Sequence, residues 1–168
     1  MIAPQSALGF LTFFIPAYIA NMTPVFVRKL PILDFPIDGG KKLNGKPLLG
    51  KNKTVRGLIF GTLAGGVTGI IISATSFPYA WWWGFLIGFA ALLGDALKSV
   101  VKRQMGIRSG GSFMPFDQID FIVIAYLASL PIVSFSALSA VTGFAVIFIC
   151  TILVQLIGAW TRLKSDSL

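Results

Sequence analysis

The sequence predicts an all-α, polytopic membrane protein with five transmembrane helices, and three observations support this. The mean hydropathy is +0.84 and 55% of the 168 residues are apolar, which lies well outside the composition of soluble domains. Five segments are apolar over the roughly 20 residues that a bilayer core requires. The 14 lysines and arginines fall into three groups between or after these segments. We therefore expect residues 1–168 to form a single membrane-embedded domain.

The expected spans follow one another with little chain between them. They cover about residues 7–27, 57–77, 79–97, 119–135 and 137–160. The links near 76–78 and 134–136 are so short that the helices on either side must form tight hairpins. In the first span Pro16, Asn21 and Pro24 predict a kinked or broken helix, with the Asn21 side chain turned toward protein. The first 27 residues carry no positive charge, so a cleaved signal peptide is not expected.

The basic residues predict the orientation in the membrane. Eight lie between Arg28 and Arg56, four between Lys98 and Arg108, and two are Arg162 and Lys164. By the positive-inside rule, the loops at about 28–56 and 98–118 and the C-terminus are cytoplasmic, and the N-terminus is outside. This predicts a multi-pass protein of the cell membrane whose active site faces the cytoplasm.

Glycines recur at intervals of four residues in the second span. They are Gly57, Gly61, Gly65 and Gly69, and the third span carries Gly84 and Gly88. Such stripes allow helix backbones to approach closely in lipid. The stripe is interpreted as packing within the hairpin of spans two and three, with a homodimer seam as the alternative.

The composition restricts the available chemistry. The chain has no histidine and no glutamate, and its one cysteine, Cys150, lies in an apolar run, where a small core residue is expected. Imidazole bases and Cys/His zinc sites are therefore excluded. In a membrane protein, the net charge of +8 indicates an anionic substrate or anionic lipid rather than nucleic acid.

The end of the third span has one polar face. At 100° per residue, Asp95, Lys98, Ser99 and Lys102 fall within about a third of the helix circumference, with Arg103 just beyond. A charged aspartate in a bilayer costs about 2.5 to 3.5 kcal/mol and usually has a partner. Asp95 is either part of a structural ion pair with Lys98 or Lys102, or part of a reaction centre.

Two further acids open the fourth span. Asp117 and Asp120 are three residues apart, so a helix would place both carboxylates on one face. Together with Asp95 they form an oxygen-donor set that suits Mg²⁺. The alternative is helix capping, with Asp117 as the N-cap and Asp120 as a first-turn acid.

The first loop alternates glycines with basic residues between Gly39 and Gly57. Glycines permit close backbone approach and lysines and arginines supply charge-assisted donors, a combination that suits a polyphosphate. The alternative is a basic stretch that only fixes the orientation of the protein at the lipid surface.

Two motifs resemble the CDP-diacylglycerol synthase family. Ser99-x-x-Lys102-Arg103, a Gly-rich loop and then Pro115-x-Asp117-x-x-Asp120 are similar to the signature of these enzymes. The segment Lys53-Thr54-x-Arg56-Gly57 and the run from Phe116 to Phe121 are closer to the archaeal branch, the CDP-archaeol synthases. Arg108-Ser109 and Gln118 depart from the bacterial pattern.

The resemblance implies a membrane-bound cytidylyltransferase. In this family a lipid phosphate attacks the α-phosphorus of CTP, giving a CDP-lipid and pyrophosphate, and the archaeal acceptor is 2,3-bis-O-(geranylgeranyl)-sn-glycerol 1-phosphate. A phosphate monoester needs no general base, so positioning and charge neutralisation suffice. One or two Mg²⁺ ions are expected on Asp95, Asp117 and Asp120, with the cations Lys98, Lys102 and Arg103 on the phosphates. The expected nucleotide-binding residues are Asn21, Lys51, Asn52, Lys53, Thr54, Arg56, Ser99 and Arg108.

Four other functions remain as alternatives. One is a CDP-diacylglycerol synthase that acts on phosphatidate. CDP-alcohol phosphotransferases also use aspartates, but no stretch of this chain supplies the first half of their pattern, Asp-x-x-Asp-Gly followed by Ala-Arg. A small channel or transporter with Asp95 on an ion path would need polar residues in the outer halves of the spans, which are almost entirely apolar. A non-catalytic scaffold gives no reason for three carboxylates beside a basic loop.

Overall fold

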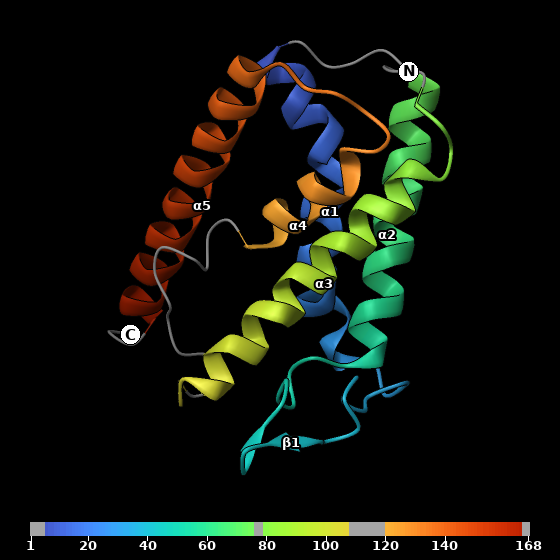
Figure 1. Ribbon diagram of the computed structural model, residues 1–168. Helices are drawn as coiled ribbons and strands as arrows, with labels where there is room; N and C mark the ends of the chain where they lie inside the picture. The colour runs from blue at the N-terminus through green and yellow to red at the C-terminus, as the bar shows by residue number, and fades with distance from the viewer. Residues whose placement is uncertain (1–5, 76–78, 108–119, 166–168) are drawn as a thin grey trace.

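The computed structural model describes residues 6–75, 79–107 and 120–165, with residues 154–165 described by their backbone. The mostly helical class is confirmed (Figure 1). The elements are α1 Ala7–Phe26, a 3₁₀ turn Val27–Lys29, β1 Lys42–Leu43, β2 Lys46–Pro47, α2 Val55–Thr75, α3 Trp83–Gln104, α4 Asp120–Ser129 and α5 Ala137–Ser165. Helix α1 is central and contacts α2, α3, α4 and α5.

Three of the described helices are long and apolar enough to cross a membrane, namely α1 with its 3₁₀ turn, α2 and α3. Helix α4 has 10 residues and therefore rises about 15 Å, roughly half of a bilayer core. It ends at Ser129 rather than near residue 135, because Leu130 precedes Pro131 and is kept out of the helical conformation. The N–H of Val133 then donates to the carbonyl of Ser129 at 2.9 Å.

Helix α1 runs without interruption through Pro16 and Pro24, so of the expected kink or break, the break is not present. Pro24 has no N–H to donate to the carbonyl of Ala20. That carbonyl faces Gly61 of α2, where an added Cβ would lie only 2.7 Å from the oxygen. Close packing of a neighbouring helix over the proline position is how membrane helices commonly tolerate proline.

The glycine stripe of α2 packs inside the chain. A Cβ at Gly65 would lie 3.1 Å from the carbonyl oxygens of Pro16 and Gly84, and a Cβ at Gly69 would lie 2.6 Å from the Cα of Gly84. These glycines are buried against α1 and α3. The interpretation as packing within the helix pair α2 and α3 holds, and a homodimer seam through this stripe is not supported.

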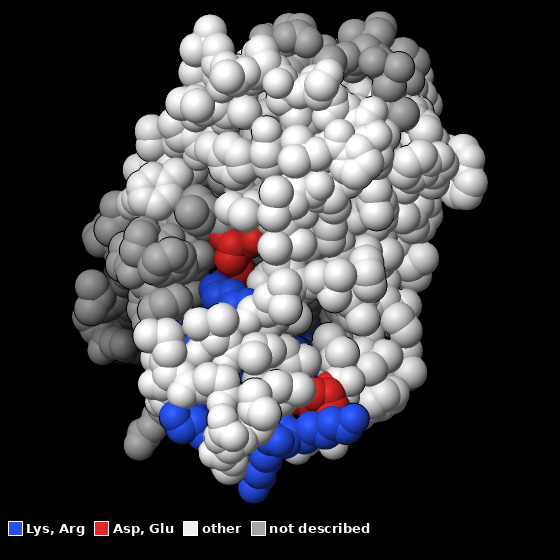
Figure 2. All heavy atoms as spheres, viewed as in Figure 1, with Lys and Arg blue, Asp and Glu red and all other residues white. Residues whose placement is uncertain are grey.

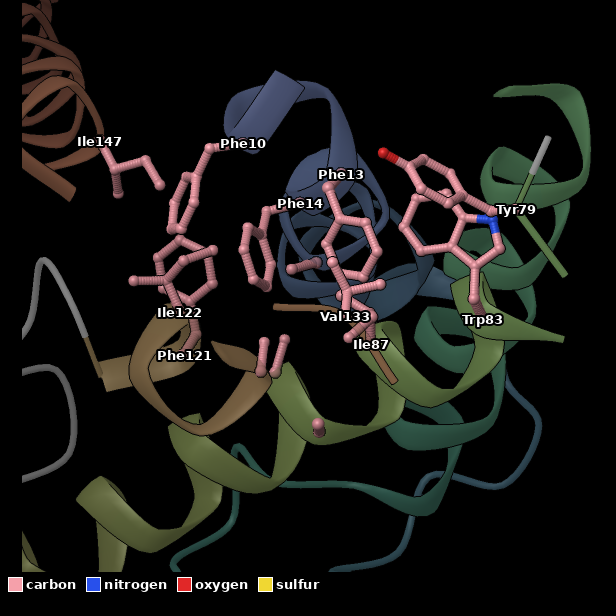
Figure 3. Close-up of a cluster of buried hydrophobic side chains, with 14 of the residues drawn as sticks. Phe10, Phe13, Phe14, Tyr79, Trp83, Ile87, Phe121, Ile122, Val133 and Ile147 are labelled. Atoms are coloured by element: carbon pink, nitrogen blue, oxygen red, sulfur yellow. The ribbon is translucent and has the colours of Figure 1, made fainter. Parts of the chain in front are cut away.

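An aromatic core lies between α1 and α3 and extends to α4 and α5 (Figure 3). Phe10, Phe13, Phe14 and Trp83 are fully buried. The rings of Phe13 and Trp83 stack with centroids 4.7 Å apart. The indole N–H of Trp83 donates to Ser73 Oγ at 2.8 Å, which ties α3 to α2 near their short link.

The outward faces of the helices are also apolar. Leu8, Val25 and Leu138 are each more than 70% exposed, as expected for surfaces that contact lipid. Cys150 of α5 is exposed as well, so the expectation of a core cysteine is wrong. An apolar run cannot reveal which face of a membrane helix is buried, since both faces are apolar.

Charge is concentrated at one end of the molecule. In Figure 1 the first loop, with β1 and β2, lies below α2 and α3, and α5 descends toward this end. Figure 2 shows the basic and acidic side chains from about the middle of this face downward, with none above them among the described residues. The charged end is where the candidate site lies.

Candidate active site

Lys98 of α3 lies between two carboxylates. Its Nζ is 3.4 Å from Oδ1 of Asp95 and 2.9 Å from Oδ2 of Asp120. The three side chains are only 10–21% exposed. Asp95 is one helical turn from Lys98, whereas Asp120 comes from α4, so the tertiary fold brings the second acid to the site.

Gly94 determines how closely Asp120 approaches. A Cβ at Gly94 would lie 2.7 Å from the carbonyl oxygen of Asp120 and 3.0 Å from the side chain of Ile124. A contact that short with a backbone atom cannot be relieved by a side-chain rotation. The start of α4 therefore rests on α3 directly beside Asp95.

Lys53 of the first loop contacts the carboxylate of Asp95. Its Nζ forms an ion pair with Oδ2 of Asp95, and both side chains are about one-fifth exposed. Each carboxylate oxygen of Asp95 thus faces an ammonium group, one from the loop and one from α3. The carboxylate is one of the points at which the loop is held against the helix bundle.

The remaining polar residues of α3 lie along the same face. Ser99 Oγ donates to the carbonyl of Asp95 at 2.9 Å, and Lys102 is only 8% exposed. Arg103 donates from Nη1 to the carbonyl of Ile107, while its Nε lies over Gly50, which has a φ of +95° that favours glycine. The predicted polar face is therefore present, and it is covered by the first loop.

Two residues predicted to bind nucleotide have partners inside the first loop. Arg56 is 3% exposed and donates to Oδ1 of Asp34 at 2.8 Å and to the carbonyl of Leu30. Thr54 accepts from the N–H of Gly57 at 3.2 Å and so caps the start of α2. These contacts shape the loop that presents Lys53.

Asp38 and Lys46 also organise this loop, although only Lys46 was expected to act there, as one of the basic residues suited to a polyphosphate. Asp38 accepts from the N–H groups of Gly40 and Leu49 at 2.9 and 2.8 Å. Lys46 Nζ donates to the carbonyl of Gln104 at 2.6 Å and fixes the hairpin of β1 and β2 to the end of α3. The Asp-Gly-Gly and Asn-Gly sequences at 38–40 and 44–45 are turn signals that point to this structure.

Two larger cavities and a small one of about 40 Å³ border the pair of Lys53 and Asp95. We call the first the α1 cavity; it has a volume of about 570 Å³ and is lined by Asn21, Pro24, Val25, Arg28, Asp34, Pro36, Lys51, Asn52, Lys53, Thr54, Arg56 and Asp95. The second, the α3 cavity, has a volume of about 140 Å³ and is lined by Leu49, Asn52, Lys53, Asp95, Lys98, Ser99, Lys102 and Arg103. Asn52, Lys53 and Asp95 belong to both, so the cavities meet at the ion pair.

Asn21 lies in the α1 cavity as the sequence predicts, turned toward protein. Its Oδ1 is buried and has no hydrogen-bond partner in the part of the chain that the structure describes. A buried amide oxygen without a partner is costly. The amide is therefore available to a bound ligand.

The expected metal ligands are described in part. Asp117, like Arg108, lies outside the described residues, and the described residues contain no group of three acids, histidines or cysteines close enough to hold a metal. Asp95 and Asp120 do converge on Lys98, and Oδ1 of Asp120 is buried without a hydrogen-bond partner among the described residues. Two neighbouring carboxylates with an unsatisfied oxygen fit a hard divalent cation.

The arrangement is suited to phosphate chemistry. Four cations, Lys53, Lys98, Lys102 and Arg103, line the α3 cavity with a single acid, Asp95. Preorganised cations of this kind stabilise the charge that develops during transfer between phosphates. The described site contains no histidine or cysteine that could serve as a nucleophile.

A family model and several curated proteins match this chain. The family model described as CarS-like, CDP-archaeol synthase, matches residues 5–164. The CDP-archaeol synthase of Methanopyrus kandleri is 41% identical over 119 residues, 70% of this chain and 66% of the relative. The protein of the same description from Staphylothermus marinus is 37% identical over 137 residues, 76% of this chain and 72% of the relative.

A solved structure also has this fold. It is described as an intramembrane enzyme for the biosynthesis of archaeal membrane lipids, and it superposes with a TM-score of 0.81 at 30% sequence identity. The similarity covers 90% of this chain and 96% of the solved chain. It therefore extends over most of the chain.

Proposed function

This chain belongs to the CDP-archaeol synthase family, and from that membership and its site we propose that it is a membrane-bound, CTP-dependent cytidylyltransferase. An oxygen of an archaeal ether-lipid phosphate attacks the α-phosphorus of CTP. The bond from that phosphorus to the oxygen bridging the α- and β-phosphates breaks, and pyrophosphate leaves with the electron pair. The product is an unsaturated CDP-archaeol.

The observation that carries this proposal is the chain of contacts from Lys53 to Asp95, Lys98 and Asp120, which begins at the two residues, Lys53 and Asp95, that line both cavities. Both substrates are phosphate esters, so the reaction centre must neutralise several negative charges. A phosphate monoester is already a nucleophile at neutral pH, so a site without a general base can work by orientation and electrostatics.

Asp95, Asp117 and Asp120 would hold one or two Mg²⁺ ions, which when bound neutralise charge on the triphosphate and on the entering phosphate. The phosphates are bound from α3 by Lys98, Lys102 and Arg103. Lys51, Asn52 and Lys53 close over them from the first loop, and Ser99 and Arg108 complete the nucleotide site. Thr54 and Arg56 contribute by holding the loop in shape.

The proposal includes the topology of the enzyme. We place five spans in the cell membrane, with the N-terminus outside and the loops at 28–56 and 98–118 in the cytoplasm, where CTP is available. The gathering of described charges at one end of the bundle supports this placement (Figure 2). Helix α4, which is short, would have to cross together with the chain on either side of it.

The test is a transfer assay with purified protein, CTP, Mg²⁺ and the geranylgeranyl glyceryl ether phosphate. CDP-lipid should form, and ATP or GTP should not replace CTP. Phosphatidate in a parallel assay distinguishes an ether-lipid enzyme from a CDP-diacylglycerol synthase. Unchanged turnover in Asp117→Ala or Asp120→Ala would reject the metal site.

A further inference from the structure

A transferase with two phosphorylated substrates needs two subsites that meet at the reacting phosphorus. The α1 and α3 cavities have this relationship, because both reach Asn52, Lys53 and Asp95 from different sides. We propose, on the basis of the function proposed above, that the α1 cavity binds the phosphate of the lipid acceptor and that Arg28 is its anchor. The α3 cavity then takes the triphosphate.

The route of the lipid chains supports this assignment. The acceptor must present its phosphate to the site while its isoprenoid chains remain among the lipids. Beside the α1 cavity, the last turn of α1 exposes Met22, Val25 and Phe26 by 52%, 73% and 74%, and Val25 also lines the cavity. An anionic headgroup in this cavity can therefore continue directly into an apolar, outward-facing surface.

Arg28 is placed to bind the headgroup. It lies in the 3₁₀ turn directly after α1, is exposed, and lines the α1 cavity. The acid in the same cavity wall, Asp34, is already paired with Arg56 at 2.8 Å, and no ion pair joins Arg28 to a described acid. An arginine at the end of a membrane helix can bind a phosphate with two parallel hydrogen bonds.

Asn21 provides a second contact in the same cavity. It lies deeper along α1 than Arg28, and its buried Oδ1 has no described partner. Rotation of the carboxamide exchanges its oxygen and its NH₂ group, so the side chain can offer an N–H to a phosphate oxygen. This moves Asn21 from the nucleotide, where the sequence analysis placed it, to the lipid phosphate.

The α3 cavity lacks a comparable route for lipid chains. Its one apolar lining residue among the described positions is Leu49, which belongs to the first loop. The remaining lining is polar and mostly cationic, as a triphosphate requires. The two cavities therefore differ in their access to an apolar surface, which the lipid acceptor needs and CTP does not.

The experiment measures the KM of each substrate separately. In Arg28→Gln, the KM for the ether-lipid phosphate should rise by about tenfold or more, which is the effect of one lost charge-assisted contact, while the KM for CTP stays unchanged. Arg28→Lys should recover part of the loss. Lys29→Gln is the matched control, because Lys29 is the neighbouring exposed cation and lines neither cavity.

Calorimetric titration of Arg28→Gln with CTP and Mg²⁺ checks that the variant is folded and retains nucleotide binding. A higher KM for CTP alone, equal increases in both KM values, or no change in either would each overturn the assignment of Arg28. Failure of the unmodified protein to form any CDP-lipid is a separate result, which rejects the proposed function itself.

Discussion

Gly94 of α3 faces the carbonyl oxygen of Asp120 so closely that a Cβ at this glycine would lie 2.7 Å from that oxygen. The absence of a side chain at one position thus sets the distance between the carboxylates of Asp95 and Asp120. Gly94→Ala should push the start of α4 away from α3. Overpacking of this kind costs about 1 to 3 kcal/mol of stability, and a displacement of about 1 Å can lower turnover roughly 100-fold.

Gly69→Ala is the control for this prediction. A Cβ there would lie 2.6 Å from the Cα of Gly84, so the steric conflict is as severe. Gly69, however, lies in the second half of α2, whereas Lys53 and the first loop adjoin the beginning of that helix. Thermal unfolding in detergent should show destabilisation of both variants. Turnover per folded molecule should fall much further in Gly94→Ala, and equal losses would contradict the positioning role.

Removing the cation between the two acids should destabilise the protein. Lys98→Met leaves Asp95 and Asp120 close together with less compensation, and loss of one partner from a buried ion pair costs about 3 to 5 kcal/mol. Adding Asp120→Asn should restore part of the stability, because it removes the uncompensated charge. Thermal unfolding without Mg²⁺ measures both effects, and a double variant less stable than Lys98→Met would contradict the pairing.

The contact of Lys53 with Asp95 should appear as an energetic coupling between the loop and α3. The variants Lys53→Met, Asp95→Asn and their combination form a double-mutant cycle, for which a coupling of about 0.5 to 3 kcal/mol is expected between contacting charges. The free energy of unfolding, measured without nucleotide, gives the value. Additive effects would mean that the pair does not hold the loop.

Arg56 should matter more to the loop than its acidic partner. Arg56 is buried and donates to two acceptors, whereas the side chain of Asp34 is 60% exposed. If the carboxylate of Asp34 is removed, Arg56 keeps its bond to the carbonyl of Leu30. Limited trypsin digestion at the lysines of the first loop should be faster in Arg56→Met than in the unmodified protein, with Asp34→Asn intermediate. Lys29→Gln serves as a control with unchanged digestion elsewhere in the loop. Faster cleavage in Asp34→Asn than in Arg56→Met would reverse this interpretation.

The proposed orientation can be tested by cysteine labelling. In a Cys150→Ala background, Lys42→Cys places one thiol in the exposed hairpin. A membrane-impermeant maleimide should label it in inverted vesicles and leave it unlabelled in intact, right-side-out cells or vesicles. The opposite pattern would place the first loop outside and overturn the topology.

The sequence predicted three of the helices closely. The first two begin and end within about two residues of their expected bounds. The third begins at Trp83, four residues later than expected, and continues from its apolar part into the polar segment as expected. Hydropathy gives this result because the length of an apolar segment is set by the bilayer. It was less informative for α4, where Pro131 ends the helix early, and for the outward face of α5, where Cys150 lies.

The site was predicted as a set of residues but not as a set of contacts. Asp95 and Lys98 lie one turn apart, so their proximity could be read from helical spacing. The pairing of Asp95 with Lys53 could not, because these residues are 42 positions apart. Thr54 and Arg56 were assigned to nucleotide from their motif, and their partners within the loop became visible only in the fold.

The sequence by itself determined that this protein lies in a membrane, that its charges gather in two loops and a C-terminal segment, and which few acids and cations are available for chemistry. Those properties depend on composition and local periodicity, which can be read from short segments of the chain without knowledge of the fold. Only the tertiary structure decided that Gly94 admits Asp120 beside Asp95, that Lys53 reaches across from the loop, and that two cavities meet there. Such contacts depend on close packing between segments distant in sequence, and no local pattern encodes that packing.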